Sequence, residues 1–231
     1  YLVAAIAAVP VLSNLLNTIW LFSKRHDLIP RIHLTNKETI IRISQIGILF
    51  FILQVTIGLT SGFDNIIISH LAGQSEVSVY AISFQLFNML GQIVTLVIAP
   101  TWPAFTEALA RGERLWVRSA LKRALTFAFA TALVGSLALV LLMPVLQTYW
   151  MRNIIQIPLA LTIGLMLWRV VDTTGNTLGI YLNAAMIVKS QVFVALATGF
   201  MMIGTKILFV YYFGVAGMAY AAVLTYLVFT L

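Results

Sequence analysis

Four ionisable residues stand inside otherwise apolar stretches of the chain: Asp64, Arg169, Asp172 and Lys206. Such groups are costly to hold in a lipid bilayer, so they usually face a bundle interior or a wet cavity and mark functional sites. Arg169 and Asp172 are three residues apart, which places them on one face of a helix. We expect a self-neutralising pair that lines a passage, although the same spacing also suits an ion pair that only fixes the rotation of its helix.

Asp64 and Lys206 are predicted to lie at similar depth in the membrane. Asp64 is eight residues before Ala72 and Lys206 is seven before Phe213, the expected outer ends of their helices. With a rise of ~1.5 Å per residue, both lie about 10 to 12 Å below the outer boundary and meet if their helices are neighbours. We expect this pair to share the central cavity. Two alternatives stay open: Lys206 snorkels to the interface, or Asp64 and Asn65 mark the true end of their span.

The composition requires that lipid surround most of the chain. Of the 231 residues, 61% are hydrophobic and only 9% are charged, whereas soluble domains carry about 25% charged residues. An apolar helix of about 20 residues spans the bilayer, so the sequence predicts an all-α polytopic transmembrane bundle of about seven helices. Cysteine is absent, and no nucleophile elbow, phosphate loop or HExxH motif occurs. We therefore expect neither an enzyme nor a metal site or cofactor.

Seven spans can be placed, with one kinked helix. The third span continues past Pro100 and Pro103, each of which removes a helix hydrogen bond and should bend it. The chain begins and stops inside apolar runs, so we expect a fragment of a longer protein without a signal peptide. The expected spans are about 1–23, 43–73, 77–101, 116–149, 155–185, 191–213 and 215–231.

The loop charges predict an orientation. Lys and Arg near span ends stay cytoplasmic, and eleven of the 14 basic residues fall in loops on one side, against Arg152 alone on the other. Tyr1 is then periplasmic and Leu231 cytoplasmic. This excess follows from topology, or also attracts anionic lipid headgroups, and we expect no nucleic acid partner. The eleven residues are Lys24, Arg25, Arg31, Lys37, Arg42, Arg111, Arg114, Arg118, Lys122, Arg123 and Lys189.

Three stretches carry a family resemblance. They read DNIIISHLAGQSEVSVYAISFQLFNML, then IAPTWPAFTEALARGE with WVRSALKRAL, and finally YLNAAMIVKSQ leading to YYFGVAGMAYAAVLTYLV. The chain resembles the multidrug/oligosaccharidyl-lipid/polysaccharide (MOP) flippase superfamily and, within it, the Wzx-like O-antigen and exopolysaccharide flippases, which carry a P-x-WPA-x-x-EA-x-x-RG element after the eighth helix. Here that cytoplasmic element consists of Pro100, Trp102, Pro103, Ala104, Glu107, Ala108, Arg111 and Gly112.

The resemblance implies one lobe of a MATE-like transporter plus the helix before it. Residues 1–36 would be the last helix of the N-terminal lobe with a cytoplasmic linker, and 37–231 the C-terminal lobe, helices seven to twelve. The implied activity is alternating-access transport of undecaprenyl-pyrophosphate-linked oligosaccharide across the bacterial inner membrane for O-antigen, exopolysaccharide or capsule assembly. Arg169, Lys206 and Asp172 would line the lumen, with the missing N-terminal lobe as partner.

The resemblance also implies a place for ion coupling. Relatives bind a cation near an acidic residue of helix seven, and Asp64 is the matching candidate. This chain departs from them at Thr205 and Lys206, where relatives often carry Asn or another small polar residue. The resemblance then leaves several couplings open: Lys206 would act as a tethered cation in place of sodium, or transport would be coupled to sodium, to protons or to the membrane potential. A cation-coupled multidrug antiporter is the alternative function. A polymerase or acyltransferase would need larger outer loops, and a purely structural subunit would not need the buried charges.

Overall fold

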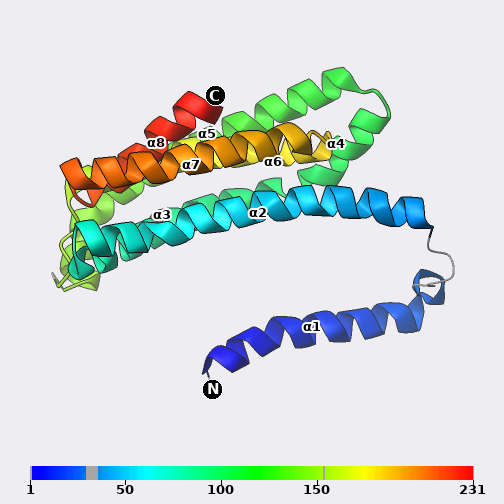
Figure 1. The fold of residues 1–231 in the computed structure, drawn as a ribbon, viewed down its shortest axis with the longest axis horizontal. Coiled ribbons are helices and arrows are strands. Elements are labelled where there is room, and N and C mark those ends of the chain that lie inside the picture. Colours follow the sequence, from blue (N-terminus) through cyan, green and yellow to red (C-terminus); the bar gives the residue numbers. More distant parts are fainter. Residues whose placement is uncertain (1, 30–35, 153, 231) are drawn as a thin grey trace. The chain divides into compact units, whose positions relative to one another are not determined.

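The computed structural model describes residues 2–29, 36–152 and 154–230 and is helical, with no strand in these ranges. The all-α prediction is confirmed, and each of the seven expected helices is present (Figure 1). Tyr1, Leu231 and Arg31 lie outside the described residues. The elements are α1 (Leu2–Lys24), η1 (His26–Leu28), α2 (Lys37–Leu71), α3 (Gln74–Ile98), α4 (Thr101–Ala110), α5 (Arg114–Val145), the π-helical η3 (Leu146–Trp150), α6 (Leu159–Ala184), α7 (Val188–Phe213) and α8 (Ala216–Thr230).

The chain divides into two compact units, Tyr1–Gln45 and Ile46–Leu231. The first holds α1, the short turn η1 and the start of α2. In it, the Arg25 guanidinium bonds both carboxylate oxygens of Asp27 at 3.0 and 2.9 Å, which lowers the pKa of that carboxyl. The division falls inside α2, whereas the resemblance places the lobe boundary at 36/37, so the lobe assignment stays a prediction.

Four helical segments are long and apolar enough to cross a membrane: α2, α3, α5 continued through η3, and α7. Their outward faces carry many large apolar side chains that water would not favour. In a bilayer these side chains contact lipid tails, which are as apolar as they are. The helical backbone is compatible with lipid as well, because its polar groups are hydrogen-bonded within the helix. Among the most exposed are Phe200 (78%), Phe193 (76%) and Leu96 (76%).

Helix α2 is continuous through the position of Asp64. It spans 35 residues, about 50 Å at ~1.5 Å per residue, which exceeds the ~30 Å hydrocarbon core. Asp64 and Asn65 lie seven and six residues before its last residue, Leu71. They therefore do not end the helix, and the place where α2 leaves the membrane stays a prediction.

The third span differs from the expected kinked helix. It is broken into two helices, α3 and α4, by a turn at residues 99–100. Pro100 has no N–H to extend α3, and the Trp102 N–H donates instead to the Ala99 carbonyl at 3.2 Å. Pro103 then falls in the first turn of α4, where its missing N–H costs nothing. Two prolines three residues apart thus stop one helix and start another.

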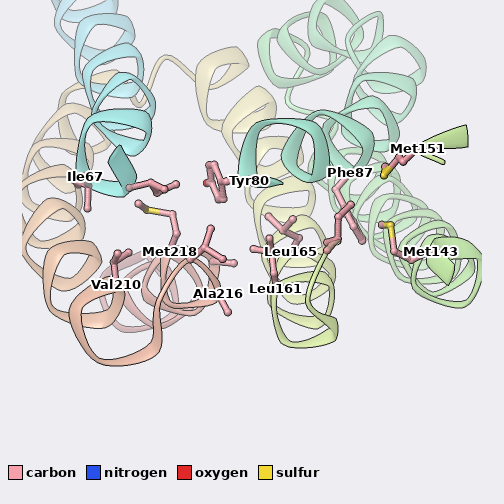
Figure 2. Close-up of a cluster of buried hydrophobic side chains, with 14 residues drawn as sticks. Ile67, Tyr80, Phe87, Met143, Met151, Leu161, Leu165, Val210, Ala216 and Met218 are labelled. Atoms are coloured by element: carbon pink, nitrogen blue, oxygen red, sulfur yellow. The ribbon is translucent and has the colours of Figure 1, made fainter. Parts of the chain in front are cut away.

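Helix α6 is the centre of the second unit, because it packs against α3, α4, α5, α7 and α8. A cluster of buried apolar side chains from α2, α3, α5, α6, α7 and α8 packs at the end of the unit where α2 turns into α3. Figure 2 shows Leu161 and Leu165 of α6 between Phe87 of α3 on one side and Met218 of α8 on the other. A central helix is shielded from lipid, which explains how α6 can hold two charged residues within its length.

Gln147 joins the two helices of the α5–α6 connection. Its side chain accepts a hydrogen bond from the Ile157 N–H at 3.2 Å and donates to the Ile157 carbonyl at 3.4 Å. These two hydrogen bonds satisfy the backbone N–H and C=O of Ile157, which lies outside the helices. Helix α6 consequently begins at Leu159, slightly later than the sequence predicts.

Candidate functional site: two buried charge pairs and a polar cavity

Asp64 and Lys206 form a buried ion pair between α2 and α7. The Lys206 ammonium lies 2.5 Å from Oδ1 of Asp64, and the Tyr80 hydroxyl of α3 donates to Oδ2 at 2.9 Å. All three residues are buried, with at most 6% of each exposed. Lys206 therefore does not snorkel to an interface. The predicted meeting of these two residues, made from their equal depth, is confirmed by the contact.

The surroundings of this pair complete its hydrogen bonding. Lys206 Nζ also donates to the Thr60 carbonyl at 3.4 Å, one turn before Asp64 on α2. Helix α7 can approach closely because a side chain at Gly199 would meet Thr56 and Thr60 within 3.0 to 3.3 Å. A buried pair whose charges are matched and bonded is tolerated, while removal of one partner leaves an uncompensated charge. We call the Asp64–Lys206 ion pair, together with the hydrogen bond that it receives from Tyr80, the three-helix pair.

Arg169 and Asp172 form the second pair, on α6 alone. Nη1 of Arg169 donates to Oδ2 of Asp172 at 2.8 Å. The two members differ in exposure, since 4% of the Arg169 side chain but 36% of the Asp172 side chain is exposed. Arg169 Nε has no hydrogen-bond partner within the described part of the chain. The predicted pair is present, and it keeps unused donor capacity.

Gly91 of α3 makes the room that Arg169 occupies. A Cβ built at Gly91 would lie 2.5 Å from Nη1 of Arg169, closer than such atoms approach, and 3.3 Å from Cζ. Glycine therefore lets the guanidinium lie at this place against the backbone of α3, and a side chain there would displace it. The sequence of α3 therefore helps to position a charge carried by α6.

A polar cavity of about 340 Å³ opens between α3 and α6 at this point. Helix α3 contributes the side chains of Asn88, Gln92 and Thr95, and helix α6 contributes the Arg169–Asp172 pair with further polar groups. Asn176 Nδ2 donates to Thr95 Oγ1 at 3.2 Å across it. The full lining is Asn88, Gly91, Gln92, Thr95, Leu96, Arg169, Asp172, Thr173 and Asn176. Amides, hydroxyls and one guanidinium give this cavity the donors that sugars and anionic groups require.

Sequence reasoning missed the neutral polar part of this lining. On α3 the residues Asn88, Gln92 and Thr95 follow the spacing i, i+4, i+7, which is one face of a helix. On α6 the residues Arg169, Asp172 and Asn176 follow the spacing i, i+3, i+7, which also lies on one face. A polar stripe in a helix that is otherwise apolar was therefore a readable signal.

Lys206 and Asp64 are not among the residues that line this cavity. The predicted place of Lys206 in a lumen with Arg169 and Asp172 therefore stays a prediction. In the second unit, Lys206 is engaged by Asp64 and the Thr60 carbonyl and is 4% exposed. One pair is sealed between helices, and the other opens into a cavity.

The proline–tryptophan element forms α4 and its flanks. Trp102 stacks on Phe50 of α2 with ring centroids 6.4 Å apart, and Phe105 is buried against Trp116 and Tyr181. Glu107 and Arg111 form an ion pair on the exposed side of the helix. The element therefore shapes a corner of the bundle and does not contribute to the polar cavity.

Gly112 ends α4 with positive φ, +73°. The Glu113 N–H donates to the Ala108 carbonyl at 2.9 Å and the Gly112 N–H to the Leu109 carbonyl at 3.1 Å, which is the Schellman arrangement. This accounts physically for the Arg-Gly at the end of the element.

No group of three His, Cys, Asp or Glu residues that could hold a metal ion occurs in the described ranges. Comparison with known proteins adds no identity. No family model matches the chain, and neither a curated protein nor a solved structure does so.

Proposed function

We propose that this chain is the C-terminal part of a transporter that moves an undecaprenyl-pyrophosphate-linked oligosaccharide across the bacterial inner membrane. The observation that carries the proposal is the polar cavity between α3 and α6, in a unit whose outward faces are apolar. A ligand-binding protein that is surrounded by water would not carry such apolar outward faces. The proposed activity forms and breaks no covalent bond, so the protein would act as a carrier and not as an enzyme.

The lining of the cavity suits the headgroup of such a substrate. Arg169 supplies a guanidinium, the group best matched to phosphate oxygens, and Asn88, Gln92 and Asn176 supply amides for sugar hydroxyls. Asp172 balances the guanidinium when the cavity holds no anion. The prenyl tail stays outside, against the apolar surfaces of the helices.

The proposed orientation follows from the ends of the second unit. The end that holds α4, the start of α5 and the start of α7 carries Arg111, Arg114, Arg118 and Lys189. Under the positive-inside rule this end is cytoplasmic, with Tyr1 periplasmic and Leu231 cytoplasmic. A second lobe of the same protein completes the passage, since repeat transporters rock their halves about a shared site.

The three-helix pair is proposed to replace a coupling cation. The Lys206 ammonium occupies the position beside Asp64 where a sodium ion would otherwise be bound. Transport by this protein then requires no sodium. A cation-coupled multidrug antiporter is the competing proposal, and it needs an Asp64 that is free to bind a cation.

Reconstitution of the full-length protein that contains this chain tests the proposal. Liposomes loaded with lipid-linked oligosaccharide on one leaflet are assayed for its appearance on the other, with and without sodium. We expect movement that persists without sodium, is lost in R169Q, and survives in K189Q, which removes a basic residue outside the cavity. Movement of a cationic drug in place of the glycolipid would support the antiporter, and full activity of R169Q would refute the proposed headgroup site.

A further inference from the structure

A second cavity, also of about 340 Å³, lies where α4, α5 and α6 meet. Its lining is Leu109 of α4, then Arg114, Val117, Arg118 and Leu121 of α5, and Tyr181 of α6. None of these residues lines the cavity at Arg169. It is formed at the end of the second unit that carries the basic residues, so it is a separate site with its own chemistry.

The charge of this second cavity is entirely positive. Arg114 and Arg118 are four residues apart and therefore neighbours on one face of α5. The lining contains no carboxylate, and neither arginine forms a salt bridge among the described residues. The nearby carboxylates of Glu107 and Glu113 are both directed to Arg111 instead. Two arginines thus line the cavity without a carboxylate in the same lining.

The rest of the lining is apolar. Val117 is buried, Leu109 and Leu121 are partly buried, and these three pack in the cluster formed by Phe105, Ala108 and Ala184. Tyr181 adds an aromatic ring with a hydroxyl donor. A free inorganic anion has no use for such walls, whereas an amphiphile has use for both the charge and the apolar surface.

We propose that this second cavity binds an anionic phospholipid from the surrounding leaflet. Its phosphate lies between the guanidinium groups of Arg114 and Arg118, and its glycerol and upper acyl chain lie over Val117, Leu121 and Leu109. A headgroup without an amine is preferred, because no carboxylate in the lining could receive one. The proposal rests on the membrane placement proposed above but not on the transported substrate.

Spin-labelled lipids test the proposal directly. The full-length protein is reconstituted in phosphatidylcholine vesicles containing a trace of spin-labelled phosphatidylglycerol or spin-labelled phosphatidylcholine, and the motionally restricted fraction is measured for each. We expect phosphatidylglycerol to be preferred, and R114Q/R118Q to reduce that preference by about tenfold or more, since each substitution removes a charge-assisted hydrogen bond to the lipid phosphate. R114K/R118K should keep part of it.

The matched control is K122Q/R123Q, which removes two positive charges from the same helix outside the cavity. We expect it to retain most of the preference. Equal losses in the two double variants would mean a diffuse charge effect and would overturn the site. Displacement of the labelled lipid by soluble glycerophosphoglycerol would also overturn it, in favour of a site for free phosphate esters.

The readout separates this proposal from the transport proposal. Lipid restriction is measured without any glycolipid present, so it stands or fails independently of flipping. A transport-dead protein that still selects phosphatidylglycerol through Arg114 and Arg118 supports the lipid site alone. Should R114Q/R118Q insert poorly, L121A, which alters only the apolar wall, must still lower the preference for the site to stand.

Discussion

The two buried charge pairs use the same chemistry in different surroundings. Asp64 and Lys206 come from two helices and are enclosed; Asp64 also accepts a hydrogen bond from the Tyr80 hydroxyl, and Lys206 also donates one to the Thr60 carbonyl. Arg169 and Asp172 come from one helix, share a single bond, and border a cavity. The difference suits two roles. A pair whose charged groups are bonded within the protein fixes its helices relative to each other, and a pair with an unused N–H donor beside a cavity can bind a ligand.

The largest expected effect is on the enclosed pair. Asp64→Ala or Lys206→Ala leaves one buried charge without its partner and should lower the free energy of unfolding by about 3–5 kcal/mol. The double variant Asp64→Leu with Lys206→Met should recover most of that loss, because no charge remains. Denaturant titration in lipid micelles measures the free energy of unfolding of the unmodified protein and of the three variants. If the double variant were as unstable as the single ones, the pair would not act as a unit.

The open pair should tolerate loss of its carboxylate better. Asp172→Asn leaves Arg169 at the edge of a cavity that admits water, so we expect a loss of only about 1–2 kcal/mol in the same titration, the lower range for a buried polar group that loses a partner. A loss as large as that of Asp64→Ala would show that the two pairs do not differ in kind.

Tyr80→Phe should sharpen the description of the three-helix pair. It removes the donor to Oδ2 of Asp64 while keeping the ring, and we expect a loss of about 1.5 kcal/mol, typical of a hydrogen bond to a charged group. Tyr220→Phe is the control, since its hydroxyl donates to the neutral Ala160 carbonyl at 2.9 Å. The control should lose less than half as much. Equal losses would indicate that Asp64 gains little from Tyr80.

Gly91→Ala should have the smallest effect on stability and act on transport. The added methyl group displaces the guanidinium of Arg169, so glycolipid movement should fall roughly fivefold, the equivalent of about 1 kcal/mol. Gly58→Ala is the control, because nothing lies within 4 Å of a Cβ there. The same proteoliposome assay compares them. An unaffected Gly91→Ala protein would mean that the position of Arg169 does not matter.

Much of this arrangement could be predicted from the sequence because membrane helices obey simple geometry. Apolar length and the rise per residue gave all seven helices, and the same rise placed Asp64 opposite Lys206. The break at Pro100 was not predicted, since one proline bends a helix and the joint action of Pro100 with Pro103 depends on where the next helix is capped. Helix positions and residue depth thus followed from the sequence, whereas the break at Pro100 did not.

The cavity could not be predicted in the same way. Arg169 and Asp172 were visible as charges, and the polar stripe of Asn88, Gln92 and Thr95 was readable on α3, but the two stripes form a cavity only because α3 lies beside α6. Likewise, the sequence could not show that Lys206 is sealed away from the cavity, because depth alone does not define which side of a helix faces a neighbour.

The sequence distance within the three-helix pair has a consequence for biosynthesis. Asp64 leaves the ribosome 142 residues before Lys206, which at ~5–20 residues per second is roughly seven to thirty seconds of translation. Throughout that interval the nascent acid has no ammonium to neutralise it, and Tyr80 is the first of its eventual partners to emerge. The ion pair that joins α2 to α7 can therefore form only after α7 has been synthesised, so this link is among the last contacts of the bundle to be made.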